Sequence, residues 1–219
     1  EPPPAKAIAD GYALLQELGA LDDDNVLTPI GASLAKLPLD PRIGRMLVAA
    51  RDLGCLKEVM VIAAGLSAQD PRERPQDRQQ AADEKHKLFA DEKSEFMGWW
   101  KLWNWFQNAV EHKKSNKQLI DTCHAHFLSY LRLREWREAH GQLHAMVTEL
   151  GWKESELPGS YDAIHQALLA GIEDLLRVHG GPSCAEYRAR SPEGMRAGLG
   201  AARRSARSAI TSDDGTTRQ

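Results

Sequence analysis

The chain has 219 residues, 42% of them hydrophobic, which is enough to bury the core of one large domain or of a large and a small one. The formal net charge of −3 conceals an asymmetry, because residues 1–176 carry 20 basic and 27 acidic side chains, whereas residues 177–219 carry 8 and 4. An acidic body argues against a free-standing, high-affinity nucleic-acid binder, since such binding depends on neutralising phosphates. A local basic surface remains compatible with this charge.

The sequence shows neither an apolar run of about 18 residues nor a charged leader followed by an apolar stretch, so we expect no membrane span and no secretion signal. Its cysteines, Cys55, Cys123 and Cys184, are odd in number and show no framework spacing. This usage is typical of a reducing compartment and indicates the cytoplasm. The first residue is Glu1 rather than methionine, and we expect a piece of a longer polypeptide.

Residues 1–40 predict a helix, a minimal β-hairpin and a second helix, which is the order of a winged-helix domain. Residues 4–18 place apolar side chains on one helical face, and a glycine follows where a left-handed C-terminal cap belongs. The turn-rich residues 21–27 are expected to close the hairpin. A Thr-Pro pair then begins a helix over residues 28–37, because the hydroxyl caps it and proline suits its first position.

Residues 41–176 predict a helical bundle, and residues 177–219 a basic, disordered tail with few large apolar residues. A helix begins at Asp40-Pro41 and ends at Gly54, and the almost continuously apolar residues 55–67 predict a helix near the centre of the bundle. Further helical patterns cover residues 79–90, 94–110, 120–131, 133–150 and 160–176, with Ser94 as the cap of the second and Ser160 at the start of the last. The fold class is therefore mostly all-α.

Tryptophans mark the helix predicted over residues 94–110. Trp99 and Trp103 share its apolar stripe, whereas Trp105 points the other way, so we expect this helix to contact a second surface. The next two apolar stripes, one of which includes Phe127 and Leu131, change register near Arg132, which predicts a bend or a new helix there.

Several segments have the pattern of one known family. They are ADGYALLQELGALD (9–22), LTPIGASLAKLPLDPRIGRML (27–47), LGCLKEVMVIAAGLSAQDPRERP (53–75), QQAADEKHKLF (79–89) and FLSYLRLREW (127–136). Through them, residues 3–171 resemble the helicase-associated region of bacterial HrpA-type DEAH-box ATP-dependent RNA helicases. In that family two RecA-like lobes hydrolyse ATP, and a winged-helix domain and a helical ratchet domain follow them.

The resemblance implies the winged helix (1–40) and the ratchet (41–176) alone, acting as an accessory region that braces the RecA-like lobes and guides single-stranded RNA during 3′–5′ unwinding. No Gly-Lys pair occurs, so the chain has no P-loop to cradle phosphates. We expect ATP and Mg²⁺ to bind the lobes of the parent enzyme, and this chain to have no catalytic residue, cofactor or metal of its own.

Two departures from the family pattern stand out. Gly141 lies within a predicted helix, where it costs about 1 kcal/mol relative to alanine if exposed. After residues 167–171 the family continues with an apolar helix and a β-rich segment, whereas this chain becomes rich in Arg and Gly. A shifted reading frame or an aberrant terminus is our hypothesis for this change, and sequencing the parent DNA would test it.

The loop QDPRERP at residues 69–75 is the sharpest local feature. On one interpretation, Arg72 and Arg74 pair with nearby carboxylates such as Asp70 and pin a surface loop between two helices. On the other, one guanidinium meets a phosphate or an acidic patch of the adjoining motor lobe, because its planar fork suits both. We favour the contact with the motor lobe over one with RNA.

A basic cluster supplies most of the positive charge in the second half of the folded part. Its side chains are either solvated and balanced by neighbouring carboxylates, or they form a strip that follows the backbone of single-stranded RNA, with Trp136 available for stacking. Trp136 also fits an apolar seam, where core packing is its expected role. The cluster consists of Lys113, Lys114, Lys117, Arg132, Arg134 and Arg137.

Two further features of the sequence suggest other functional classes. Cys123, His124 and His126 suggest a metal site, but on a helix His124 points away from the other two and no second ligand pair has zinc-like spacing. A non-enzymatic adaptor that docks proteins through Trp105 and the acidic faces is the alternative to the helicase interpretation. Salt-sensitive RNA binding would separate the two.

Overall fold

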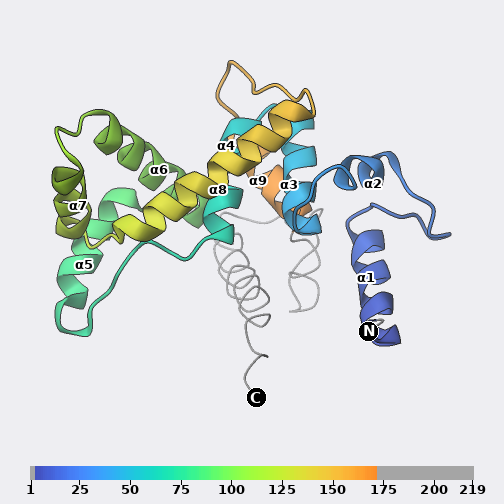
Figure 1. The fold of residues 1–219 in the computed structure, drawn as a ribbon, viewed down its shortest axis with the longest axis horizontal. Helices are drawn as coiled ribbons and strands as arrows, with labels where there is room; N and C mark the ends of the chain where they lie inside the picture. The colour runs from blue at the N-terminus through green and yellow to red at the C-terminus, as the bar shows by residue number, and fades with distance from the viewer. Residues whose placement is uncertain (1–2, 172–219) are drawn as a thin grey trace. The chain divides into compact units, whose positions relative to one another are not determined.

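A computed structural model describes residues 3–171, and the predicted tail lies outside the described residues (Figure 1). Contacts divide the described residues into two compact units, one formed by residues 3–59 and 146–171 and the other by residues 60–145. The predicted domain boundaries are not tested by this division and stay predictions.

The described residues are mostly helical, as predicted. Extended pairing within residues 3–171 is confined to two isolated antiparallel bridges, Leu21 with Leu27 and Arg72 with Leu128. No helix of this part of the chain is both long and apolar enough to cross a membrane. The elements are α1 (Ala5–Glu17), α2 (Pro29–Leu34), α3 (Pro41–Asp52), α4 (Leu56–Ser67), η1 (Gln76–Arg78), α5 (Gln79–His86), η2 (Lys87–Phe89), α6 (Glu95–Glu111), α7 (Asn116–Ala125), α8 (Tyr130–Glu149) and α9 (Tyr161–Ala170).

The first unit begins with the predicted helix, hairpin and helix. The bridge between Leu21 and Leu27 confirms the hairpin. The side chain of Thr28 accepts a hydrogen bond from the amide of Gly31 at 3.1 Å, so it caps α2 as predicted. Helix α2 ends at Leu34, earlier than the sequence pattern indicated.

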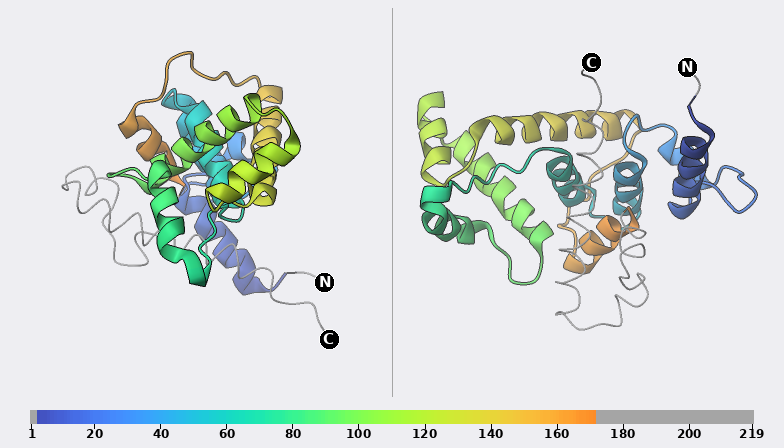
Figure 2. Two further views of the ribbon diagram at one scale, coloured as in Figure 1. Left: turned by 90° about the vertical axis from the view of Figure 1, so that its left-hand side faces the viewer. Right: turned by 90° about the horizontal axis from the view of Figure 1, so that it is seen from below.

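The core of the first unit joins this N-terminal part to α3. Ala20, Leu34, Leu37 and Val48 are buried together, and Trp152 packs partly buried against them. Helix α9 lies against α3, as Figure 2 also shows. The buried carboxylate of Glu58 accepts a hydrogen bond from the amide of Gly159 at 3.1 Å, which fastens the segment that leads into α9.

The second unit is built around a cluster of tryptophans. Trp136 of α8 is fully buried, and its indole N–H donates to the carbonyl oxygen of Val61 in α4 at 2.9 Å. The rings of Trp99 and Trp103, both on α6, lie with their centroids 5.1 Å from that of Trp136. Gly65 makes this packing possible, because a Cβ there would lie 2.7 Å from Trp99 and 3.0 Å from Trp136.

Four helices end in the same way, with a residue in the left-handed region and a pair of hydrogen bonds back into the last turn. Helices α1, α3 and α8 use Gly19 (φ 68°), Gly54 (φ 69°) and Gly151 (φ 73°) there. Helix α7 instead uses Phe127, with φ 53°. The amide of Phe127 donates to His124 O at 3.0 Å, and the next amide donates to Cys123 O at 2.9 Å. A bulky residue at this position is strained relative to glycine.

The expectations for Trp105 and Leu131 had different outcomes. Trp105 does contact a second surface, as expected, and the same unit supplies it: its ring lies 5.3 Å from that of Phe89 and 4.8 Å from that of His126. Leu131 is 53% exposed, and the fully buried Leu128 takes the core position instead. The expectation for Leu131 was wrong because the chain turns between α7 and α8, which changes the face that points inward.

Two helical glycines should respond oppositely to alanine. Gly65→Ala should lower the free energy of unfolding by about 1–3 kcal/mol, because its methyl group would overlap two tryptophan rings. Gly141→Ala is the matched control, since a Cβ there meets no atom within 4 Å, and it should raise stability by up to about 1 kcal/mol. Urea denaturation of the 219-residue chain measures both; a neutral Gly65→Ala would contradict the packing described.

Candidate functional site

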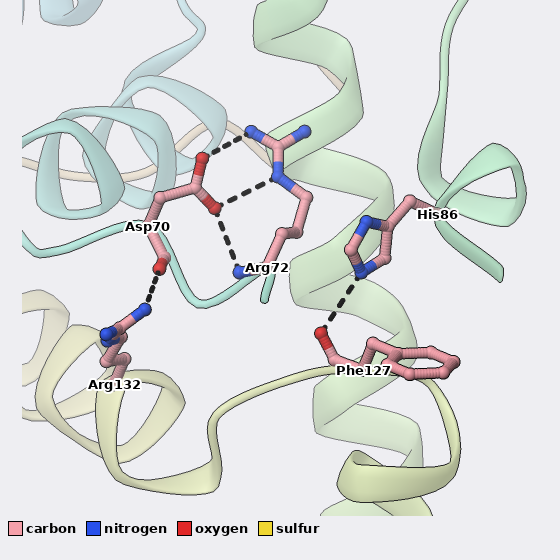
Figure 3. Close-up of polar contacts among 5 residues, drawn as sticks. All are labelled: Asp70, Arg72, His86, Phe127 and Arg132. Carbon is pink, nitrogen blue, oxygen red and sulfur yellow. Dashed lines mark hydrogen bonds and ion pairs between the residues drawn. The ribbon is translucent and has the colours of Figure 1, made fainter. Parts of the chain in front are cut away.

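The loop of residues 69–75 is held by an ion pair within itself (Figure 3). The guanidinium of Arg72 donates from Nε to Asp70 Oδ1 at 3.0 Å and from Nη2 to Asp70 Oδ2 at 2.9 Å, and the Arg72 amide also donates to Oδ1 at 3.0 Å. The guanidinium of Arg132 donates to the carbonyl oxygen of Asp70 at 3.1 Å. Asp70 therefore connects its own loop to the first turn of α8.

The same loop pairs with the turn between α7 and α8. The amide of Ser129 donates to Pro71 O at 2.8 Å, and the amide of Glu73 donates to Phe127 O at 2.8 Å. The carbonyl oxygen of Phe127 also lies 3.1 Å from His86 Nε2, which donates to it because a carbonyl oxygen can only accept (Figure 3). Loop and turn thus form one hydrogen-bonded junction.

Arg72 also links the loop to the tryptophan cluster. Its guanidinium carbon lies 5.2 Å from the centre of the Trp99 ring, within the range of a cation–π contact. The side chains of Arg72 and Asp70 are only 20% and 14% exposed. With its charge paired and its plane on an indole, Arg72 serves to hold the loop in place.

Arg74 lies in a different environment. Its guanidinium pairs with Asp83 of α5 at 2.6 Å, and these side chains are 60% and 45% exposed. Exposed pairs of this kind contribute at most about 1 kcal/mol, so an incoming anion can take the place of Asp83 at little cost. Of the two arginines predicted as contacts to a motor lobe, Arg74 is the accessible one.

The predicted basic cluster lies in two places on the second unit. Lys113, Lys114 and Lys117 are exposed at the turn between α6 and α7, where Ser115 caps α7 by accepting from the Gln118 amide at 3.1 Å. The arginines of the cluster follow on α8, beyond the far end of α7. Since α7 has ten residues, about 15 Å of helix separates the two places.

The three arginines on α8 are not equivalent. Arg132 is directed to the Asp70 carbonyl oxygen and is partly buried. Arg134 is exposed and pairs with Glu138 at 3.4 Å, and Arg137 is exposed one turn further along the helix. The structure therefore leaves five cationic side chains of the predicted set directed to solvent, and uses the sixth to hold the loop.

The histidines and the cysteine considered as metal ligands have other surroundings. His126 Nδ1 lies 2.9 Å from the carbonyl oxygen of Thr122, and burial raises the pKa of the Cys123 thiol to about 11. Within residues 3–171, no three His, Cys, Asp or Glu side chains are grouped so that they could hold a metal ion.

Comparison with known proteins bears on both units. Residues 12–39 match the family described as helicase-associated domain (HA2), winged-helix, and residues 40–119 match the helicase-associated domain (HA2), ratchet-like. The chain belongs to the helicase-associated (HA2) family. The sequence resemblance to this region of HrpA-type DEAH-box RNA helicases is thereby confirmed.

Several longer proteins are similar to most of this chain. The ATP-dependent RNA helicase HrpA of Escherichia coli is 44% identical over 78% of the chain, and its homolog in Haemophilus influenzae is 42% identical over 78%. The DExH-box ATP-dependent RNA helicase DExH1 of Arabidopsis thaliana is 32% identical over 74%. The chain spans 14%, 14% and 16% of these three proteins.

The sequence analysis did not identify the roles of three residues of the candidate site. Asp83 was not expected to pair with Arg74, because nine residues and a turn separate them in the sequence. Phe127 was assigned to an apolar stripe, and no sequence signal marks its left-handed conformation, since α2 and α6 also end without a glycine but have no left-handed residue there. Arg78 was not singled out, yet its guanidinium carbon lies 5.4 Å from the centre of the Phe127 ring.

Replacing each loop arginine should separate their roles. Arg72→Ala should lower the free energy of unfolding by about 2 kcal/mol, because it leaves a mostly buried carboxylate without its bidentate partner. Arg74→Ala is the matched control in the same loop and should cost less than about 1 kcal/mol. Urea denaturation measures both, and equal losses would show that the two ion pairs do not differ as described.

His140 should make stability depend on pH. Burial, together with the neighbouring His144, lowers the pKa of His140 to about 4. Because the unfolded chain takes up this proton near pH 6.5 and the folded chain does not, stability falls as the pH decreases from 6.5 towards 4. His140→Gln should flatten that part of the curve of melting temperature against pH. The exposed His124→Gln is the control, and an unchanged slope for His140→Gln would contradict the assignment.

Proposed function

We propose that this chain is the accessory part of an ATP-dependent RNA helicase, which braces the two RecA-like lobes and guides single-stranded RNA during unwinding from 3′ to 5′. The HA2 matches carry the proposal, because they cover residues 12–119 and the similar proteins bear the name RNA helicase. ATP and Mg²⁺ would bind in the lobes of the parent protein, whose place is the cytoplasm. The chain itself contributes surfaces and stiffness.

A rigid second unit suits this role. A wall that guides a moving strand must keep its shape while the lobes open and close. The edge-to-face packing of the tryptophans, the Trp136 hydrogen bond to α4 and the junction between the loop and α8 provide that stiffness. The bundle would act as a passive guide, with the force supplied by hydrolysis elsewhere in the parent protein.

Two sets of exposed cations are assigned to two partners. Arg74 would contact an acidic group of the adjoining lobe, since its pairing with Asp83 is exposed and exchangeable. The RNA backbone would contact the exposed members of the basic cluster, which are Lys113, Lys114, Lys117, Arg134 and Arg137. Arg72 and Arg132 would support these contacts from within the unit.

The adaptor alternative has less support from the structure. Its proposed docking residue was Trp105, which is packed against Phe89 and His126 of the same unit. Removing that indole from its neighbours to bind another protein would expose apolar surface that is now buried. The helicase proposal requires no such rearrangement.

Removing the lysines at the turn between α6 and α7 should weaken RNA binding in a salt-dependent way. For the chain carrying Lys113→Gln, Lys114→Gln and Lys117→Gln, the slope of log K against log salt for single-stranded RNA should become shallower by up to about 2, since each phosphate contact contributes about 0.7. Fluorescence anisotropy with a labelled oligouridylate between about 50 and 200 mM salt measures the slope.

A second triple variant controls for net charge. Lys6→Gln, Lys36→Gln and Lys153→Gln remove three exposed lysines of the first unit and should leave the slope near that of the original chain. Equal changes in both variants would mean that RNA responds to overall charge, which contradicts a local contact. No measurable binding by the original chain would favour the adaptor.

A further inference from the structure

Helix α7 ends on a strained residue, Phe127. Three helices end on glycine in the left-handed region, and α7 ends on a phenylalanine with φ 53°. A bulky side chain in this region is unfavourable, and residues held so are concentrated where the strain serves a function. Glycine would give the same two hydrogen bonds at the end of α7 without strain. The aromatic ring itself is therefore the feature to explain.

The Phe127 ring supports a cation that is otherwise open to solvent. The guanidinium carbon of Arg78 lies 5.4 Å from the ring centre, and the Arg78 side chain is 64% exposed. Its pairing with Asp77 is loose, at 3.6 Å, and that carboxylate is 78% exposed. One side of the guanidinium thus faces an aromatic ring, and most of the side chain remains accessible.

Arg78 also lines an open surface hollow. Three exposed glutamines share the lining, and their amides can both donate and accept hydrogen bonds: Gln76, Gln79 and Gln80. The hollow also contains two carboxylates, Asp77 and Glu84. Glu84 pairs with Lys87 at 2.8 Å, so both acids have a cationic partner within the unit.

The Phe127 junction keeps this arrangement in place. The carbonyl oxygen of Phe127 accepts hydrogen bonds from Glu73 and His86, which lie on either side of Arg78 in the sequence. The turn that carries the ring is thus connected to the segments before and after Arg78. A preformed aromatic and guanidinium pair loses little entropy when a flat ligand is added.

We propose that Phe127 and Arg78 form a stacking platform for one base of single-stranded RNA, with the glutamine-lined hollow receiving the edge of that base. Bases of single-stranded RNA stack on aromatic rings and on arginine planes, and side-chain amides bond to their edges. The platform rests on the proposed function, because it requires RNA to pass along this unit. It adds a base contact to the phosphate contacts assigned to the lysines.

The test compares a normal oligouridylate with an abasic oligonucleotide of the same length, each titrated into the 219-residue chain. Arg78→Lys keeps the charge but loses the planar group, and it should bind the oligouridylate roughly tenfold more weakly while binding the abasic strand as before. Arg51→Lys is the matched control, since Arg51 lies 4.7 Å from the Trp152 ring in the first unit and should have no effect.

Each other outcome overturns part of the assignment. Unchanged oligouridylate binding by Arg78→Lys rejects the platform alone, and equal weakening for both strands shows a backbone contact in its place. Absence of binding by the original chain overturns the platform together with the RNA contacts of the proposed function. Phe127→Leu keeps an apolar side chain without the ring and should also weaken oligouridylate binding; where it does not fold, Arg78→Lys decides.

Discussion

The hydrogen bond from the buried Trp136 indole to the backbone of α4 is the constraint on which the second unit depends. It requires the ring of Trp136 to approach the α4 backbone directly, which only a residue without a side chain at position 65 permits. Trp99 and Trp103 then complete a three-ring cluster around Trp136. The positions of α4, α6 and α8 within this unit follow from that contact, and buried aromatic surface supplies much of its stability.

Charged side chains connect this tryptophan cluster to the loop at the surface of the unit. Arg72 lies over Trp99, Asp70 holds Arg72, and Arg132 holds Asp70 by its carbonyl oxygen. The first residues of α8 and the loop before η1 are thereby placed relative to a rigid core. The exposed guanidinium of Arg74 extends from this support, so the loop combines a fixed arginine with an exchangeable one.

Local chemistry made much of the fold predictable. The hydroxyl caps at Thr28, Ser94 and Ser160, and the glycines after α1 and α3, depend on neighbours within a few residues, and the structure confirms them. The family could be recognised for a similar reason, since its pattern lies in continuous segments such as residues 53–75.

Features that depend on distant parts of the chain could not be predicted in this way. Arg132 was assigned to a solvent-facing strip because its sequence neighbours are charged, but its partner lies 62 residues away. Trp105 was correctly expected to contact a second surface, but periodicity could not show that the segment carrying Phe89 supplies it. The sequence was enough to name the arginines and lysines of the candidate site. Which of them are held within the unit and which are exposed became clear only from the three-dimensional contacts.

The missing side chain at position 65 has a consequence for how such sequences can diverge. Glycine and the large indole opposite it fill one volume together, so neither position can change alone without a clash or a void. In a lineage where residue 65 gained a methyl group, residues 99 and 136 would both have to become smaller or move at about the same time. The three positions are thus expected to be inherited as a matched set, although 71 residues separate the first from the last in the sequence.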